Sequence, residues 1–129
     1  DFRQLYTDIK HHYDTIRKYA KNTGRSIYSF GWMLDIARCI YTLRNGKIIA
    51  KTDAGKWALE NNLCPDPDAL RIALEVRRNP LEHKGDKQTF DYAETLAEPI
   101  QRFADVLEKE LKISKQDVRI NENAENDYI

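Results

Sequence analysis

Apolar residues recur at intervals of three and four along most of this 129-residue chain, and this spacing limits the possible folds more than any other feature. Over residues 1–22, one apolar stripe follows the 3.6-residue period of a helix: Phe2, Leu5, Tyr6, Ile9, Tyr13, Ile16 and Ala20. No segment longer than the Ile48-Ile49 pair shows the two-residue period of a strand. The chain is therefore predicted to be all-helical.

Five glycines and four prolines fall mainly between these stripes and divide the chain into about five helices. The predicted helices span 1–22, 26–45, 53–61, 67–78 and 87–112. The second is apolar over most of its circumference, so we expect it at the centre of a bundle. Thr52 and Asp66 are predicted N-caps, and Gly46 is a predicted left-handed C-cap. Pro99 should kink or split the last helix.

From residue 114 onward the chain consists mainly of Asn, Asp, Glu and Lys, with few apolar residues. Such a composition favours disorder, because too little apolar surface can be buried. The predicted organisation is a helical domain over 1–113 followed by a flexible tail over 114–129.

Charge and cysteine usage exclude several classes of protein. Lys and Arg number 21, as do Asp and Glu, so the net charge is zero and nucleic-acid binding by charge alone is not expected. No apolar run approaches the ~18 residues of a membrane span. Cys39 and Cys64 stand in unrelated contexts without metal-ligand spacing, which favours free thiols and a cytoplasmic location.

Two histidine-containing patterns raise the question of catalysis or metal binding. Asp8, His11 and His12 cluster on the first predicted helix, but adjacent histidines point to different sides of a helix, so no metal site is expected. Arg78 and His83, separated by four residues, resemble the short motif of HEPN helical domains, some of which are ribonucleases. There an arginine would hold a phosphate while a histidine transfers protons. The alternative interpretation is a solvated helix end.

Lys47 and Lys51 flank the start of the third predicted helix. A lysine beside the free N–H groups of a helix start can bind a phosphate. The alternative is an ordinary solvated lysine in a loop.

The segment 38–59 resembles the C-terminal domain of the adenylyltransferases that inactivate streptomycin and spectinomycin. That family has an arginine and an aromatic residue on its central helix, then a Thr-Gly-Lys-Ile turn, a Lys-Asp step and an Ala-x-x-Trp-Ala helix. The matching residues here are Arg38, Tyr41, Gly46, Lys47, Lys51, Ala54, Trp57 and Ala58. A looser similarity extends over about 30–111.

The resemblance implies the helical half of a two-domain enzyme that transfers AMP from ATP to a drug hydroxyl. A separate N-terminal nucleotidyltransferase domain would carry the Gly-Ser loop and the aspartates that hold ATP and Mg²⁺, since this chain has no such loop and no catalytic residue is assigned to it. The helical domain would close the cleft over nucleotide and aminoglycoside. Lys51 matches the family lysine that contacts the phosphates, and Lys47 is a second candidate.

Two positions depart from the family pattern. Pro80 stands where the family has a nucleotide-contacting tyrosine, and the stretch 26–30 lacks the carboxylates that grip the cationic drug. Asp35 and Asp53 are the candidate substitutes for those carboxylates. Two other functions stay open at this point: a stand-alone helical protein-binding module, and the HEPN-like ribonuclease.

Overall fold

The computed structural model describes the backbone of residues 1–127 and the side chains of residues 1–116. Within that part of the chain the regular structure is entirely helical, which confirms the predicted fold class. The elements are α1 (Phe2–Tyr19), the 3₁₀ turn η1 (Ile27–Ser29), α2 (Phe30–Asn45), α3 (Lys51–Glu60), α4 (Pro67–Arg78), α5 (Pro80–His83), α6 (Lys87–Ala93) and α7 (Ala97–Asp127).

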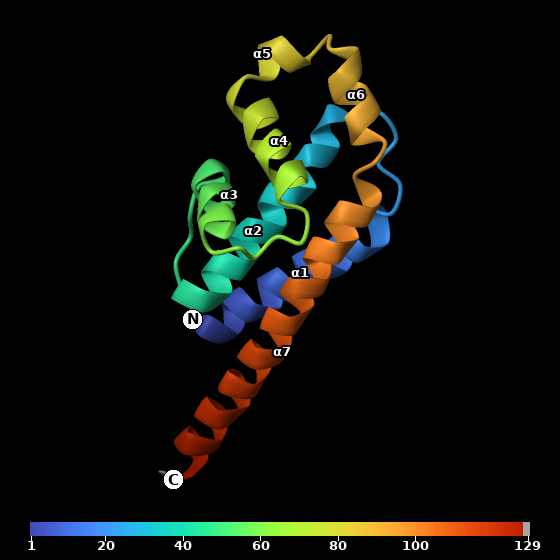
Figure 1. The fold of residues 1–129 in the computed structure, drawn as a ribbon. Helices are drawn as coiled ribbons and strands as arrows, with labels where there is room; N and C mark the ends of the chain where they lie inside the picture. Colours follow the sequence, from blue (N-terminus) through green and yellow to red (C-terminus); the bar gives the residue numbers. More distant parts are fainter. Residues whose placement is uncertain (128–129) are drawn as a thin grey trace.

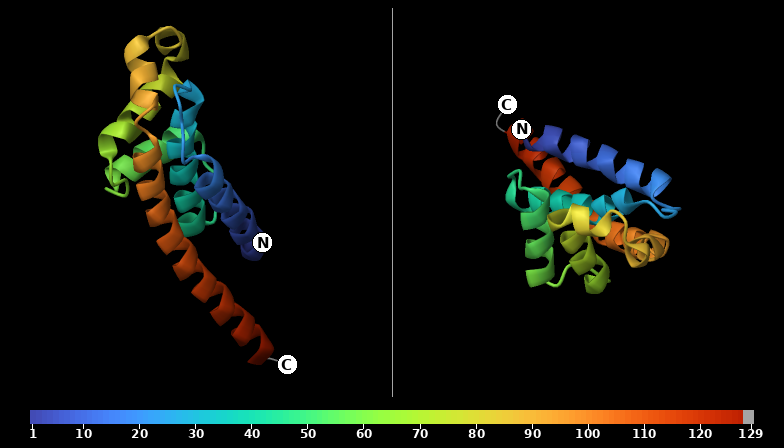
Figure 2. Two further views of the ribbon diagram at one scale, coloured as in Figure 1. Left: turned by 90° about the vertical axis from the view of Figure 1, so that its right-hand side faces the viewer. Right: turned by 90° about the horizontal axis from the view of Figure 1, so that it is seen from above.

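Helix α2 lies at the centre of the bundle, as its broad apolar surface predicts. It contacts α1 and α7 on one side and α3 and α4 on the other (Figures 1 and 2). Eight of its side chains are buried: Phe30, Met33, Leu34, Ile36, Ala37, Cys39, Ile40 and Leu43. The core therefore forms around α2, and the first turns of α2 reach the end of the bundle where α4 and α5 meet.

Two of the predicted caps are present, and one is not. Gly46 adopts the left-handed conformation at φ 67° and donates its N–H to Thr42, and the Asp66 carboxylate accepts from the N–H of Ala69 at 3.2 Å. The prediction of Thr52 as an N-cap is wrong. Helix α3 begins at Lys51, and its N-cap Ala50 has no side chain that can accept a hydrogen bond.

The last predicted helix is two helices, α6 and α7, separated by residues 94–96. Of the two predicted outcomes, a kink or a split, the helix is therefore split, and the break lies just before Pro99. Pro99 itself lies in the first turn of α7, which begins at Ala97, where its lack of an N–H costs no hydrogen bond. Helix α7 continues to Asp127, past the boundary predicted at 113, and projects beyond the other helices (Figure 2). Ser114 is buried, so packing against the bundle extends at least one residue past that boundary. The part of the predicted flexible tail at 128–129 lies outside the described residues.

Buried polar contacts join the connection after α1 to the C-terminal helices. The Thr23 hydroxyl donates to the carbonyl of Ala93 at 2.6 Å, and the Ser29 hydroxyl donates to the carbonyl of Thr23 at 3.1 Å. Arg17 donates to the carbonyl of Gln101 at 2.9 Å, and the Gln101 amide donates to the carbonyls of Ile16 in α1 and of Ala20, the residue that follows α1. These bonds fix the position of η1 and therefore of the start of α2.

Helix α3 packs closely against α2 and α4 at Gly55. A methyl carbon added at Gly55 would lie 2.8 Å from Cδ2 of Leu74 and 3.0 Å from Cδ2 of Leu34. The absence of a side chain at this position brings α3 against its two neighbours and places its first residue, Lys51, near α2.

Candidate functional site

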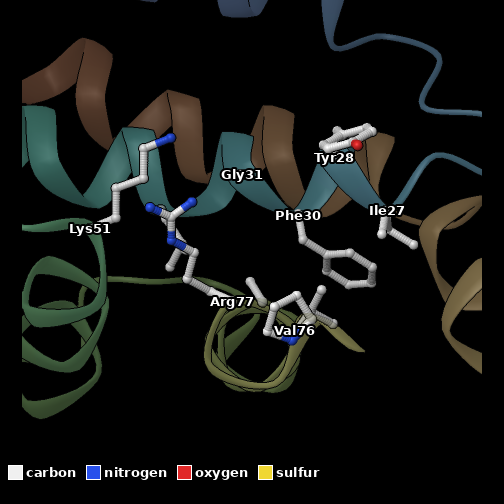
Figure 3. Close-up of a pocket in the computed structure, with 10 residues that line it drawn as sticks. Ile27, Tyr28, Phe30, Gly31, Lys51, Val76 and Arg77 are labelled. Carbon is white, nitrogen blue, oxygen red and sulfur yellow. The ribbon is translucent and has the colours of Figure 1, made fainter. Parts of the chain in front are cut away.

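A groove with a volume of about 510 Å³ lies between the start of α2 and the end of α4 (Figure 3). Buried apolar side chains form part of its wall: Phe30, Leu34, Ala73 and Val76. Tyr28 of η1 lines the same groove with a side chain that is 86% exposed. The groove therefore offers apolar and aromatic surface to a ligand with a flat or hydrophobic part.

Two cationic side chains lie toward one end of this groove. Lys51 comes from the first turn of α3 and Arg77 from the last turn of α4 (Figure 3). Arg77 is exposed and has no ion pair or hydrogen bond with another residue in the described part of the chain. A fully charged guanidinium without a partner is suited to bind an anionic ligand.

The start of α3 adds hydrogen-bond donors beside these cations. The first N–H groups of any helix have no partner within the helix, and Ala50 supplies no capping side chain. The positive end of the helix dipole also lies there. The α3 start and Lys51 together form the kind of arrangement that binds phosphate groups.

Lys51 is paired with Asp35 in this structure. Its Nζ lies 3.0 Å from Oδ1 of Asp35, whose side chain is only 15% exposed, and Nε2 of His12 lies 3.8 Å from the other carboxylate oxygen. Asp35 also borders two smaller hollows of about 250 and 230 Å³, the second of which is lined by Arg38. The fold thus brings Lys51 and Asp35 together as an ion pair at the junction of three hollows.

Of the four predicted site residues, only Lys51 lines the large groove, whereas Asp35, Lys47 and Asp53 are not among its lining residues. Lys47 is exposed in the turn after α2, where its carbonyl accepts a hydrogen bond from the Thr42 hydroxyl. Asp53 is exposed in the first turn of α3. Neither residue lines the groove that contains Lys51 and Arg77.

Arg77 and Tyr28 were not predicted as site residues. Arg77 is one of two adjacent arginines at a helix end, and the local pattern does not distinguish it from the exposed Arg78. Tyr28 stands in the stretch that lacks the expected carboxylates, and it brings an aromatic ring to the groove instead. Pro80, at the departure from the family tyrosine, also lines the groove. These residues become recognisable as one site only when α4 packs against α2 and brings them to the same groove.

The adjacent histidines of α1 point to different sides of the helix, as expected, and His83 lies apart from Arg78. His12 faces Asp35, and His11 is exposed. His83 contacts Thr89 and Glu75, and no hydrogen bond or ion pair joins it to Arg78 within the described side chains. The ribonuclease hypothesis stays a prediction, which RNA cleavage by a His83→Ala variant would refute if the cleavage rate were unchanged.

Both cysteines are buried free thiols. Burial raises the pKa of Cys39 to about 12 and that of Cys64 to about 11. Because only the thiolate is a strong nucleophile or metal ligand, neither cysteine is suited to act as one near neutral pH.

The structure is an all-helical domain with a groove that combines an apolar wall, an exposed aromatic ring and two cations. The family described as the C-terminal domain of aminoglycoside adenylyltransferase matches residues 3–110, and the chain belongs to this family. No curated protein and no solved structure matches the chain. Within the described residues no helix has both the length and the hydropathy needed to cross a membrane.

Proposed function

We propose that this chain is the nucleotide- and substrate-closing domain of a nucleotidyltransferase that transfers AMP from ATP to a hydroxyl of an aminoglycoside-type drug. Its partner is an N-terminal catalytic domain, which supplies most of the ligands for ATP and Mg²⁺. The observation that carries the proposal is the pair of cations, Lys51 and Arg77, at one end of the groove beside the start of α3.

The residues present fit a phosphate better than a metal ion. Lys51, Arg77 and the N–H groups of the α3 start are all donors or positive charges, whereas no carboxylate stands among the described residues that line the groove, and the nearby Asp35 is already paired with Lys51. Mg²⁺ requires several oxygen ligands in an octahedral arrangement. We therefore propose that this chain binds the phosphate oxygens of the nucleotide and that the partner domain binds the metal ion. The apolar wall of the groove and the ring of Tyr28 are suited to contact the adenine base of the nucleotide.

Asp35 provides the link between nucleotide and drug. If a phosphate binds Lys51, the Asp35 carboxylate loses its ion pair with Lys51 while its side chain stays largely buried. A buried carboxylate without a partner favours binding of another cation. An ammonium or guanidinium group of the drug supplies that cation. This assignment uses Asp35 in preference to Asp53, because Asp35 is largely buried and paired with Lys51 whereas Asp53 is exposed.

Titration with ATP–Mg followed by backbone amide NMR tests the nucleotide site and detects weak binding. The amide signals of 51–53 and Arg77 should shift, and Lys51→Ala or Arg77→Ala should weaken binding by roughly tenfold or more, as expected for a charge-assisted hydrogen bond. Lys56→Ala is the matched control, because Lys56 is an exposed lysine on the same helix. Equal affinities in all four proteins would refute the site.

The drug site is tested with streptomycin in the presence of ATP–Mg. Asp35→Asn should reduce streptomycin affinity, whereas Asp53→Asn should leave it close to the original value. The reverse result would move the cation site to the exposed face of α3. No effect from either variant would show that the carboxylates for the drug come from elsewhere.

A further inference from the structure

A second group of chemically active side chains lies where α4, α5 and α6 meet. Glu75 of α4, and Glu82 and His83 of α5, each offer one ligand atom, and these three atoms lie within 4.8 Å of one another. No local spacing predicts this group, because Glu75 is on a different helix from the other two residues.

Hydrogen bonds determine which nitrogen of His83 carries a proton. The Thr89 hydroxyl donates its single proton to Asp86 at 2.7 Å, and this hydrogen bond holds the pKa of the Asp86 carboxyl below its usual value. The Thr89 oxygen must therefore accept at its other contact, the 2.9 Å hydrogen bond with Nδ1 of His83. Nδ1 carries the proton, and in the neutral ring Nε2 presents a lone pair.

That lone pair has no partner in the described part of the chain. Nε2 of His83 is buried and makes no hydrogen bond, and the nearest carboxylate oxygen, Oε1 of Glu75, lies 3.6 Å away. The Glu75 side chain is about half exposed, whereas Nε2 of His83 is a buried acceptor without a hydrogen bond, and such an atom favours a proton or a cation beside it. The Glu75 carboxylate is itself oriented by a hydrogen bond from Asn79 at 2.9 Å.

The distance favours a metal ion over a shared proton. A direct N–H···O hydrogen bond has a length of about 2.7–3.2 Å. Two ligand atoms of one tetrahedral Zn²⁺, at bond lengths of about 2.1 Å, lie roughly 3.4 Å apart. The 3.6 Å between Nε2 of His83 and Oε1 of Glu75 is closer to the second value. The Thr89–Asp86 relay behind Nδ1 also matches the way in which metal-binding histidines are oriented by an outer oxygen.

We propose that Glu75, Glu82 and His83 bind a divalent transition-metal ion such as Zn²⁺, with water completing the coordination. One imidazole and two carboxylates suit such an ion, whereas Mg²⁺ prefers oxygen ligands alone. The ion would link α5 to α4 next to Arg77 and Pro80, and would so stabilise the connection between these two helices beside the groove. The proposal is independent of nucleotide binding.

Calorimetric titration of the EDTA-treated chain with ZnCl₂, in a buffer containing excess Mg²⁺, tests the site. One equivalent of Zn²⁺ should bind, and His83→Ala and Glu82→Gln should each weaken binding at least tenfold. Glu82 is exposed, so its variant is expected to fold even if the His83 variant does not. His11→Ala is the matched control, since His11 is an exposed histidine outside the group.

Cobalt substitution identifies the ligands independently. Co²⁺ should give the visible absorption of a four-coordinate site without a thiolate charge-transfer band, and this absorption should be lost in Glu82→Gln but kept in His11→Ala. The proposal is overturned if the Glu82 variant binds Zn²⁺ as tightly as the original chain, if His11→Ala weakens binding equally, or if Mg²⁺ competes. A proton, and not a metal ion, would then lie between Nε2 of His83 and the Glu75 carboxylate.

Discussion

The close approach of α3 at Gly55 allows a stability prediction in which two known effects oppose each other. Replacing glycine by alanine in a helix interior ordinarily stabilises the helix by about 1 kcal/mol. At Gly55, however, the new methyl group would lie 2.8 Å from Leu74 and 3.0 Å from Leu34, well inside the ~3.5–4.0 Å of an ordinary carbon contact. Overpacking of this kind costs about 1–3 kcal/mol.

The larger of these two energies decides whether Gly55→Ala stabilises or destabilises the protein. Taking about 2 kcal/mol for the overpacking and about 1 kcal/mol for the helix propensity, Gly55→Ala should lower the free energy of unfolding by about 1 kcal/mol. In a chain of this size such a loss lowers Tm by roughly 4 °C. Because α3 also carries Lys51, relief of the clash by a shift of α3 would move the ammonium group relative to Asp35.

Urea denaturation followed by circular dichroism measures this difference. Gly31→Ala is the control, because Gly31 is also helical but a methyl group there would meet no atom within 4 Å. The control should be unchanged or more stable by up to about 1 kcal/mol. A Gly55→Ala protein that is more stable than the original by a similar amount would refute the packing argument.

Three further predictions rest on single contacts. Thr23→Val removes the buried donor to the Ala93 carbonyl and should lower the free energy of unfolding by about 1–3 kcal/mol, measured in urea. Arg17→Met should cost about 1–2 kcal/mol in the same assay, mainly through its lost bonds to α7, since the ion pairs it makes are partly exposed. The raised pKa values keep Cys39 and Cys64 as neutral thiols below about pH 11, so Ellman's reagent at pH 8 should react slowly with the folded chain and fast in denaturant; rapid reaction with the folded chain would contradict their burial.

The helical fold could be predicted from the sequence because apolar spacing and turn residues are local signals. Gly46 and Asp66 cap helices where the pattern indicates. Thr52 has the chemistry of a cap but does not act as one, because α3 starts at Lys51, two residues before the predicted start at 53. The end of the last helix was also misplaced: the polar sequence after 113 does not show that Ser114 is buried by the bundle.

The candidate site was predictable only in part. The helix-start argument and the family pattern both selected Lys51, which lines the groove. Asp35 was selected as a drug contact, and the fold pairs it with Lys51, a contact that no spacing predicts because the two residues lie on different helices. Arg77 and the Glu75–His83 contact depend on how α4 packs against α2 and α5, which is a tertiary property.

The ion pair between Lys51 and Asp35 also affects how much charge an anion needs in order to bind at Lys51. A monovalent anion such as chloride offers Lys51 no more charge than Asp35 already does, and it would leave the largely buried carboxylate without its main partner. A triphosphate carries several charges and can reach Arg77 and the start of α3 at the same time. Asp35 therefore disfavours a monovalent anion at Lys51, whereas a multivalent phosphate that also contacts Arg77 can take the place of the carboxylate.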